Sequence, residues 1–76
     1  MTYDVARIAY ELEETALGNS YYGNSLYVAL DLPCITHNDR GCLIRYLYGS
    51  ELTTDHIRLQ EIAGYIREWG IANGKI

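Results

Sequence analysis

Apolar side chains recur every three or four positions over most of the chain, which is the pattern of amphipathic helices. In the first such segment, residues 3–17, the apolar positions are Val5, Ile8, Ala9, Leu12 and Ala16. Thr2 is expected to cap this helix, Asp4 to favour the positive end of its dipole, and Gly18 to follow its last turn. The pattern therefore predicts an amphipathic helix at the start of the chain.

A shorter apolar run, SLYVALDLP, fits two kinds of structure. Its apolar residues alternate as in a strand at positions 26, 28 and 30, and they follow helical spacing at positions 26, 29 and 30. The other periodic segments are helical, and a lone strand has no partner to pair with. We therefore expect a short helix over residues 25–31, which ends before Pro33.

The second half of the chain predicts two longer helices, over residues 37–48 and 54–70, with Gly49 ending the first and Thr54 capping the second. The apolar stripe of the last helix consists of Leu59, Ile62, Ala63, Ile66 and Trp69. Gly64 interrupts this helix, where a glycine either admits a neighbouring helix or is merely tolerated, and the final IANGKI is expected to fray. The predicted fold is all-α: one domain, a small bundle of three longer helices and one short helix.

Tyrosine is unusually common in this short chain, whose 76 residues include eight tyrosines, one tryptophan and no phenylalanine. Tyr21 and Tyr22 lie in GNSYYGNS, a run of turn-forming residues that predicts a loop and a candidate contact site. A domain of this size buries only about 60% of its unfolded surface, so small domains often gain stability by association. Tyrosine is also enriched at interfaces. We therefore expect a homo-oligomer.

The net charge of −4 is concentrated in the first part of the chain, where residues 1–31 contain Arg7 as their only base. Such an acidic chain is a poor match for duplex DNA, because phosphate contacts dominate that affinity. Glu11, Glu13 and Glu14 either form a solvated helix face or present a negative surface to a basic protein. No apolar stretch approaches the roughly 20 residues that span a bilayer, and no signal peptide is visible. The predicted location is the cytoplasm, where both cysteines are free thiols.

Residues 34–42, CITHNDRGC, combine possible metal ligands with a helix-start signal. Structural zinc needs four ligands, and Cys34, His37 and Cys42 supply at most three, of which the last two point about 140° apart on a helix. No catalytic spacing or phosphate-binding loop occurs in the chain. The run THND matches a capping box with Thr36 as the N-cap. We therefore expect a helix start at this point, and no metal site, cofactor or catalysis.

A second face of the same predicted helix carries polar and aromatic residues at helical spacing. Arginine and tyrosine beside a helix N-terminus could hold a phosphate and stack a base. Alternatively, Arg40 and Arg45 pair with acidic residues of the first or fourth helix. The candidate ligand-binding residues are Tyr21, Tyr22, His37, Arg40, Arg45 and Tyr48, with Ile44 on the same face.

The run ALDLPCITHNDRGCLIRYLYG resembles short orphan accessory proteins of bacteriophages and prophages. This resemblance implies the category of anti-defence proteins, which block a host defence protein or sequester a nucleotide signal, and it carries over no individual residue. We expect a non-catalytic binding protein that sequesters a nucleotide immune signal in a pocket of a homo-oligomer, in the host cytoplasm. The alternatives are an acidic, anti-CRISPR-like inhibitor of a host defence complex that docks through Glu11, Glu13 and Glu14, a small helix-turn-helix regulator, and an assembly protein.

Overall fold

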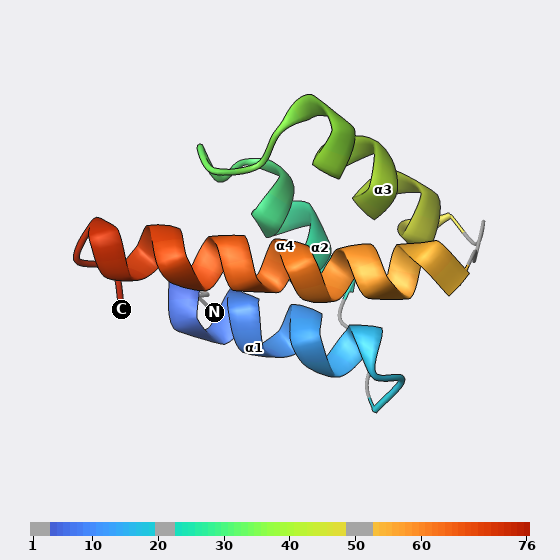
Figure 1. Cartoon of the computed structure of the whole chain (residues 1–76), viewed down its shortest axis with the longest axis horizontal. Coiled ribbons are helices and arrows are strands. Elements are labelled where there is room, and N and C mark those ends of the chain that lie inside the picture. The colour runs from blue at the N-terminus through green and yellow to red at the C-terminus, as the bar shows by residue number, and fades with distance from the viewer. Residues whose placement is uncertain (1–3, 20–22, 49–52) are drawn as a thin grey trace.

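The computed structural model describes residues 4–19, 23–48 and 53–76, which contain four α-helices and no strand. The helices are α1 (Val5–Ala16), α2 (Gly23–Leu30), α3 (His37–Leu47) and α4 (Thr53–Ala72). α1 and α3 each pack against α4, and α2 packs against α1 and α3. Figure 1 shows α1 running alongside the long α4 in the opposite direction. The predicted all-α fold is confirmed for these residues, and the ambiguous segment before Pro33 is a helix.

α1 begins two residues later than the sequence predicted, because Asp4 and not Thr2 is its N-cap. Asp4 has an extended backbone, and its carboxylate accepts a hydrogen bond of 2.7 Å from the backbone N–H of Arg7. At the other end Gly18 has a positive φ of 78°, as predicted for the position after the helix. The N–H of Asn19 then donates to the carbonyl of Glu14 at 3.0 Å, which closes a Schellman motif.

The C-terminal end of α4 is ordered by the same motif, so the predicted fraying of IANGKI is wrong. Gly74 has a φ of 69°, and the N–H of Lys75 donates to the carbonyl of Gly70 at 2.7 Å. The chain thereby turns back, and a Cβ added at Gly70 would lie within 3 Å of side-chain atoms of Ile76 and Val5. Gly70 is therefore the position of close approach. Gly64 has no atom within 4 Å of an added Cβ and is merely tolerated.

The remaining helix boundaries lie within two residues of the predicted ones. α2 starts at Gly23 and ends at Leu30, α3 ends one residue before Tyr48, and α4 begins at Thr53, so that Thr54 lies inside the helix and is not its cap. Thr2, Tyr21, Tyr22 and Gly49 lie outside the described residues.

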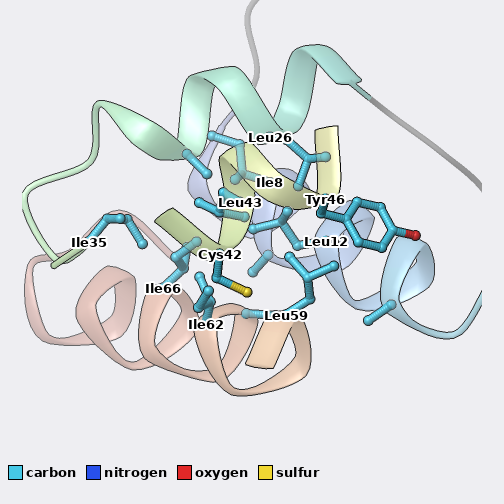
Figure 2. Packing of buried hydrophobic residues seen from close by; sticks show 14 residues of the cluster. Ile8, Leu12, Leu26, Ile35, Cys42, Leu43, Tyr46, Leu59, Ile62 and Ile66 are labelled. Atoms are coloured by element: carbon cyan, nitrogen blue, oxygen red, sulfur yellow. The ribbon is translucent and has the colours of Figure 1, made fainter. Parts of the chain in front are cut away.

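The core is formed by one cluster of buried apolar side chains at the centre of the bundle (Figure 2). α1 contributes Ile8, Ala9, Leu12 and Ala16, and α4 contributes Leu59, Ile62, Ala63 and Ile66. The other members are Leu26, Ala29, Ile35, Cys42, Leu43 and Tyr46. The predicted stripes of the first and last helices are thus the buried faces, except that Val5 and Trp69 are only half-buried. Within the described residues, no helix is both long and apolar enough to cross a membrane.

Candidate functional site

The start of α3 is held by the capping box that the sequence predicted. The Thr36 hydroxyl accepts from the N–H of Asp39 at 3.2 Å, and the Asp39 carboxylate accepts from the N–H of Thr36 at 3.1 Å and from its hydroxyl at 2.7 Å. These bonds satisfy donors that a helix start otherwise leaves free. They also fix the carboxylate of Asp39, which is 1% exposed, toward α4.

Arg58 of α4 completes this arrangement by bonding to two carboxylates. Its guanidinium donates through Nη2 to Asp39 and through Nη1 to Glu61 at 2.7 Å, and it lies 5.6 Å from the centre of the Tyr65 ring. The hydrogen bond to Glu61 and the charge of Asp39 raise the pKa of Arg58, which stays charged. Burial opposes ionisation of Asp39, but the Thr36 hydrogen bonds and the Arg58 charge outweigh it and lower the pKa of Asp39. The pair therefore stays ionised at neutral pH.

A partly open pocket of about 440 Å³ lies beside this pair, between α4 and the connection that leads from α2 into α3. From the connection and the first turn of α3 it is lined by Cys34, Thr36 and Asp39, and from α4 by Arg58, Tyr65, Glu68, Trp69 and Ala72. We call it the α4 pocket. Figure 1 shows the connection above the C-terminal half of α4, so residues about thirty positions apart face each other there.

The lining of the α4 pocket includes two aromatic and two acidic side chains, namely Tyr65, Trp69, Asp39 and Glu68. Tyr65 is 47% exposed, Trp69 is half-buried, and Glu68 is exposed. Among the described residues, no group hydrogen-bonds to or pairs with the Glu68 carboxylate. Arg58, by contrast, is already neutralised by Asp39 and Glu61. The pocket thus offers aromatic faces and an unpaired negative charge, which suits a cationic group.

Among the described residues, no group of three or more potential metal ligands occurs, either around the two thiols of CITHNDRGC or elsewhere. Cys42 belongs to the core, 3.5 Å from Oδ1 of Asp55, and burial together with that carboxylate raises its pKa to about 11. Burial also raises the pKa of Cys34, which is half-buried in the wall of the α4 pocket. Both side chains are therefore protonated thiols at neutral pH.

The candidate nucleotide-binding residues of α3 share an exposed face of that helix. His37, Arg40, Ile44 and Tyr48 are all exposed, and none of them lines the α4 pocket. Arg40 makes no ion pair with another described residue, whereas the hydroxyl of Tyr48 lies 2.8 Å from that of Tyr27 in α2. The other two candidates, Tyr21 and Tyr22, lie outside the described residues, so the structure places only the α3 part of this set.

Arg45 pairs with an acidic residue of α4, which is the alternative to ligand binding that the sequence left open. Its Nη2 lies 3.6 Å from Oδ1 of Asp55, whose side chain is almost fully buried. The second oxygen of that carboxylate is buried and has no hydrogen-bond partner among the described residues. Arg45 is thus engaged in holding the start of α4 against α3.

The three glutamates proposed as an acidic interface do not form one surface. Glu11 is 4% exposed and accepts from Nε of Arg7 at 3.0 Å and from the hydroxyl of Ser25 in α2. Glu13 pairs with Arg67 of α4 at 2.9 Å. Glu14 accepts from the Asn19 amide at 2.8 Å. Glu11 therefore joins α1 to α2 inside the bundle, while the interface role of Glu13 and Glu14 stays a prediction.

The sequence analysis did not single out Arg58, Tyr65 and Glu68, and it assigned Trp69 to the core. A signal was present, since Tyr65, Glu68, Trp69 and Ala72 follow the i, i+3, i+4, i+7 spacing of one helix face. The spacing does not show which segment of the chain covers this face. Comparison of the chain with protein-family models, with curated proteins and with solved structures finds no match.

Proposed function

We propose that the chain is a non-catalytic binding protein that captures a basic segment of another protein in the α4 pocket. The observation that carries the proposal is the Glu68 carboxylate, which has no partner among the described residues and lines the pocket together with the rings of Tyr65 and Trp69, while the Arg58 cation of the pocket is neutralised. Aromatic faces and carboxylates attract cationic side chains, and the net charge of −4 adds long-range attraction for a basic partner.

The phage resemblance gives this binding a context. Of the two modes of action that it implies, blocking a host defence protein agrees with an acidic and aromatic pocket better than holding a nucleotide does. A nucleotide brings phosphates, which need unpaired cations, and the pocket has none. We therefore infer that the protein acts as an acidic inhibitor that occupies a basic site of a host protein.

Trp69 makes the proposal directly testable, because it is the only tryptophan of the chain and it lines the pocket. Its fluorescence is followed while short peptides of alternating glycine and arginine, or of alternating glycine and lysine, are added at low ionic strength. We expect a saturable change that weakens as salt is added, since screening acts on charge pairs at the surface. Absence of any change in fluorescence, and of any heat of binding, with both peptides would refute the proposal.

Sequestration of a nucleotide is the second candidate, and one observation favours it. Arg40 is exposed and without an ion pair among the described residues, on the same α3 face as His37 and Tyr48. Calorimetry with cyclic and linear nucleotides separates the candidates: heat from a nucleotide, together with none from the basic peptides, selects this one. Sedimentation of the same samples measures the homo-oligomer that sequestration requires.

The regulator alternative has less support, because Arg58 and Arg67 of α4 are both in ion pairs.

A further inference from the structure

The bundle already contains one bound guanidinium, that of Arg58, and it shows how this surface holds such a group. The Cζ atom of Arg58 lies over the Tyr65 ring, 5.6 Å from its centre, and the guanidinium nitrogens donate to the carboxylates of Asp39 and Glu61. An aromatic face and a carboxylate at the edge are the two contacts that a planar cation makes best.

The same pair of groups occurs again one turn further along α4. Trp69 follows Tyr65 by four residues and Glu68 follows it by three, so both lie next to Tyr65 on one side of the helix. Both line the α4 pocket, and in the described part of the chain the Glu68 carboxylate has no hydrogen-bond or ion-pair partner. Arg58 therefore fills one aromatic–carboxylate pair, and the second pair is open to a ligand.

The chemistry of this second pair distinguishes between possible cations. An ammonium group is compact and strongly hydrated, whereas a guanidinium is planar, less hydrated, and able to stack on an indole while it bonds sideways to a carboxylate. Tryptophan is the best of the aromatic side chains for such a contact. A pocket of about 440 Å³ lies in the lower half of the range for ligand sites and is large enough for an arginine side chain.

We propose that the α4 pocket recognises an arginine side chain of the partner, with its guanidinium stacked on Trp69 and hydrogen-bonded to Glu68. This inference rests on the proposed function and narrows it from a basic segment to one residue type. The neighbouring Arg58–Asp39 pair lines the same pocket, and because Asp39 is already paired with Arg58, Glu68 is the lining carboxylate that can accept the incoming guanidinium.

The experiment compares the glycine–arginine and glycine–lysine peptides, which carry equal charge, on the native chain and on two glutamate variants. We expect the arginine peptide to bind about tenfold more tightly than the lysine peptide to the native chain. Glu68→Gln, an exposed position, is expected to weaken binding of the arginine peptide about fivefold or more. The control is Glu14→Gln on α1, which removes the same charge outside the pocket, keeps an acceptor for Asn19, and is expected to leave the preference unchanged.

The outcomes separate this inference from the proposed function. Equal affinity for both peptides overturns arginine recognition and leaves a general cation-binding pocket. Equal effects of the two glutamate variants overturn both the pocket and arginine recognition, because binding would then depend only on net charge. No binding of either peptide overturns the proposed function itself. Trp69→Leu gives an independent reading by calorimetry, because loss of the arginine preference with retained weak binding is expected only if the indole stacks on the guanidinium.

Discussion

The two halves of α4 differ in what their polar side chains contact. In the first half, His56 bonds to the end of α1, Asp55 pairs with Arg45 of α3, and Arg58 pairs with Asp39. In the second half, Arg67 also pairs with Glu13 of α1, but the neighbouring Glu68 is exposed and unpaired among the described residues, and Trp69 lines the α4 pocket. Both halves bury the same kind of apolar stripe, in which Leu59 and Ile66 are fully buried.

The difference separates stability from binding along one helix. Polar side chains that satisfy other parts of the fold cannot be removed without cost, because their partners stay behind desolvated. Polar side chains without internal partners add little to stability and are available to a ligand. Variants in the first half are therefore expected to change the free energy of unfolding, and those around Glu68 and Trp69 to change binding.

The largest effect is expected for Asp39→Ala, which should lower the free energy of unfolding by about 3 kcal/mol. Loss of the Asp39 half of the capping box, with Thr36 still in place, accounts for about 1 kcal/mol, and loss of the Arg58–Asp39 bond, after which Arg58 keeps only Glu61, for about 2 kcal/mol. Urea unfolding followed by circular dichroism measures the change.

The matched comparison for Asp39 is Glu68→Ala, a carboxylate of the same pocket that has no partner among the described residues. We expect its effect to stay within about 0.5 kcal/mol. If the two variants were equally destabilising, the distinction between the halves of α4 would be wrong.

His56 should have the next largest effect, because it joins three helices. Its Nδ1 donates to the carbonyl of Ala16 at 3.1 Å, and its ring meets that of Tyr46 edge-on at 5.4 Å. Tyr46 in turn donates to the carbonyl of Thr15 at 3.2 Å, and Figure 2 shows its hydroxyl at the margin of the core cluster. His56→Ala is expected to cost about 2 kcal/mol, from one partly buried hydrogen bond and one aromatic contact.

The chain offers a control for this variant in its other histidine. His37 is exposed at the start of α3, and the same substitution there should change the free energy of unfolding by less than about 0.5 kcal/mol. Thermal unfolding of the two variants side by side is sufficient. If His56→Ala lowered the free energy of unfolding less than His37→Ala does, the hydrogen bond from His56 to the Ala16 carbonyl at the end of α1 would not contribute to stability.

The helices were predictable because their signals are local. The apolar spacing of α1 and α4 predicted which faces are buried, and the run THND predicted the start of α3. The errors were local too: Asp4 competed with Thr2 as the N-cap, and Gly74 ordered an end that composition alone marked as frayed. Asp4, two residues after Thr2, accepts from the backbone of α1, and the turn at Gly74 lets Lys75 donate to the end of α4. In both cases a residue close in sequence provided the backbone hydrogen bond.

The site was less predictable, because it depends on contacts between distant segments. Nothing in the sequence near Asp39 indicates that its partner is Arg58, or that Ser25 accompanies Glu11 into the bundle. The spacing of Tyr65 and Trp69 marks a helix face, but only the tertiary structure shows that the connection before α3 covers part of it and leaves a pocket. Pairing across the bundle decides which charges are free, and periodicity carries no information about it.

Two glycines sharpen the comparison, because they test packing rather than polar contacts. At Gly70 a methyl group would meet Ile76 and Val5, and we expect Gly70→Ala to destabilise by about 1 kcal/mol after the gain in helix propensity is subtracted. At Gly64 the space is open, and Gly64→Ala should stabilise by up to about 1 kcal/mol. Opposite signs in urea unfolding are the expected result, and equal signs would contradict the close approach at Gly70.

The smallest expected effect is the change in the free energy of unfolding at acidic pH. The ordinary pKa of an aspartate is 3.8, and that of Asp39 in the folded chain is lower, so folding favours its ionised form. Its contribution to stability is therefore fully present above the ordinary pKa and is lost as the pH falls through the lower, folded value. Asp39→Asn removes this titration, so the stabilities of the native chain and the variant should converge between neutral pH and strong acid. A difference in stability between the two that stays constant from neutral pH to strong acid would contradict the coupling of Asp39 to Arg58.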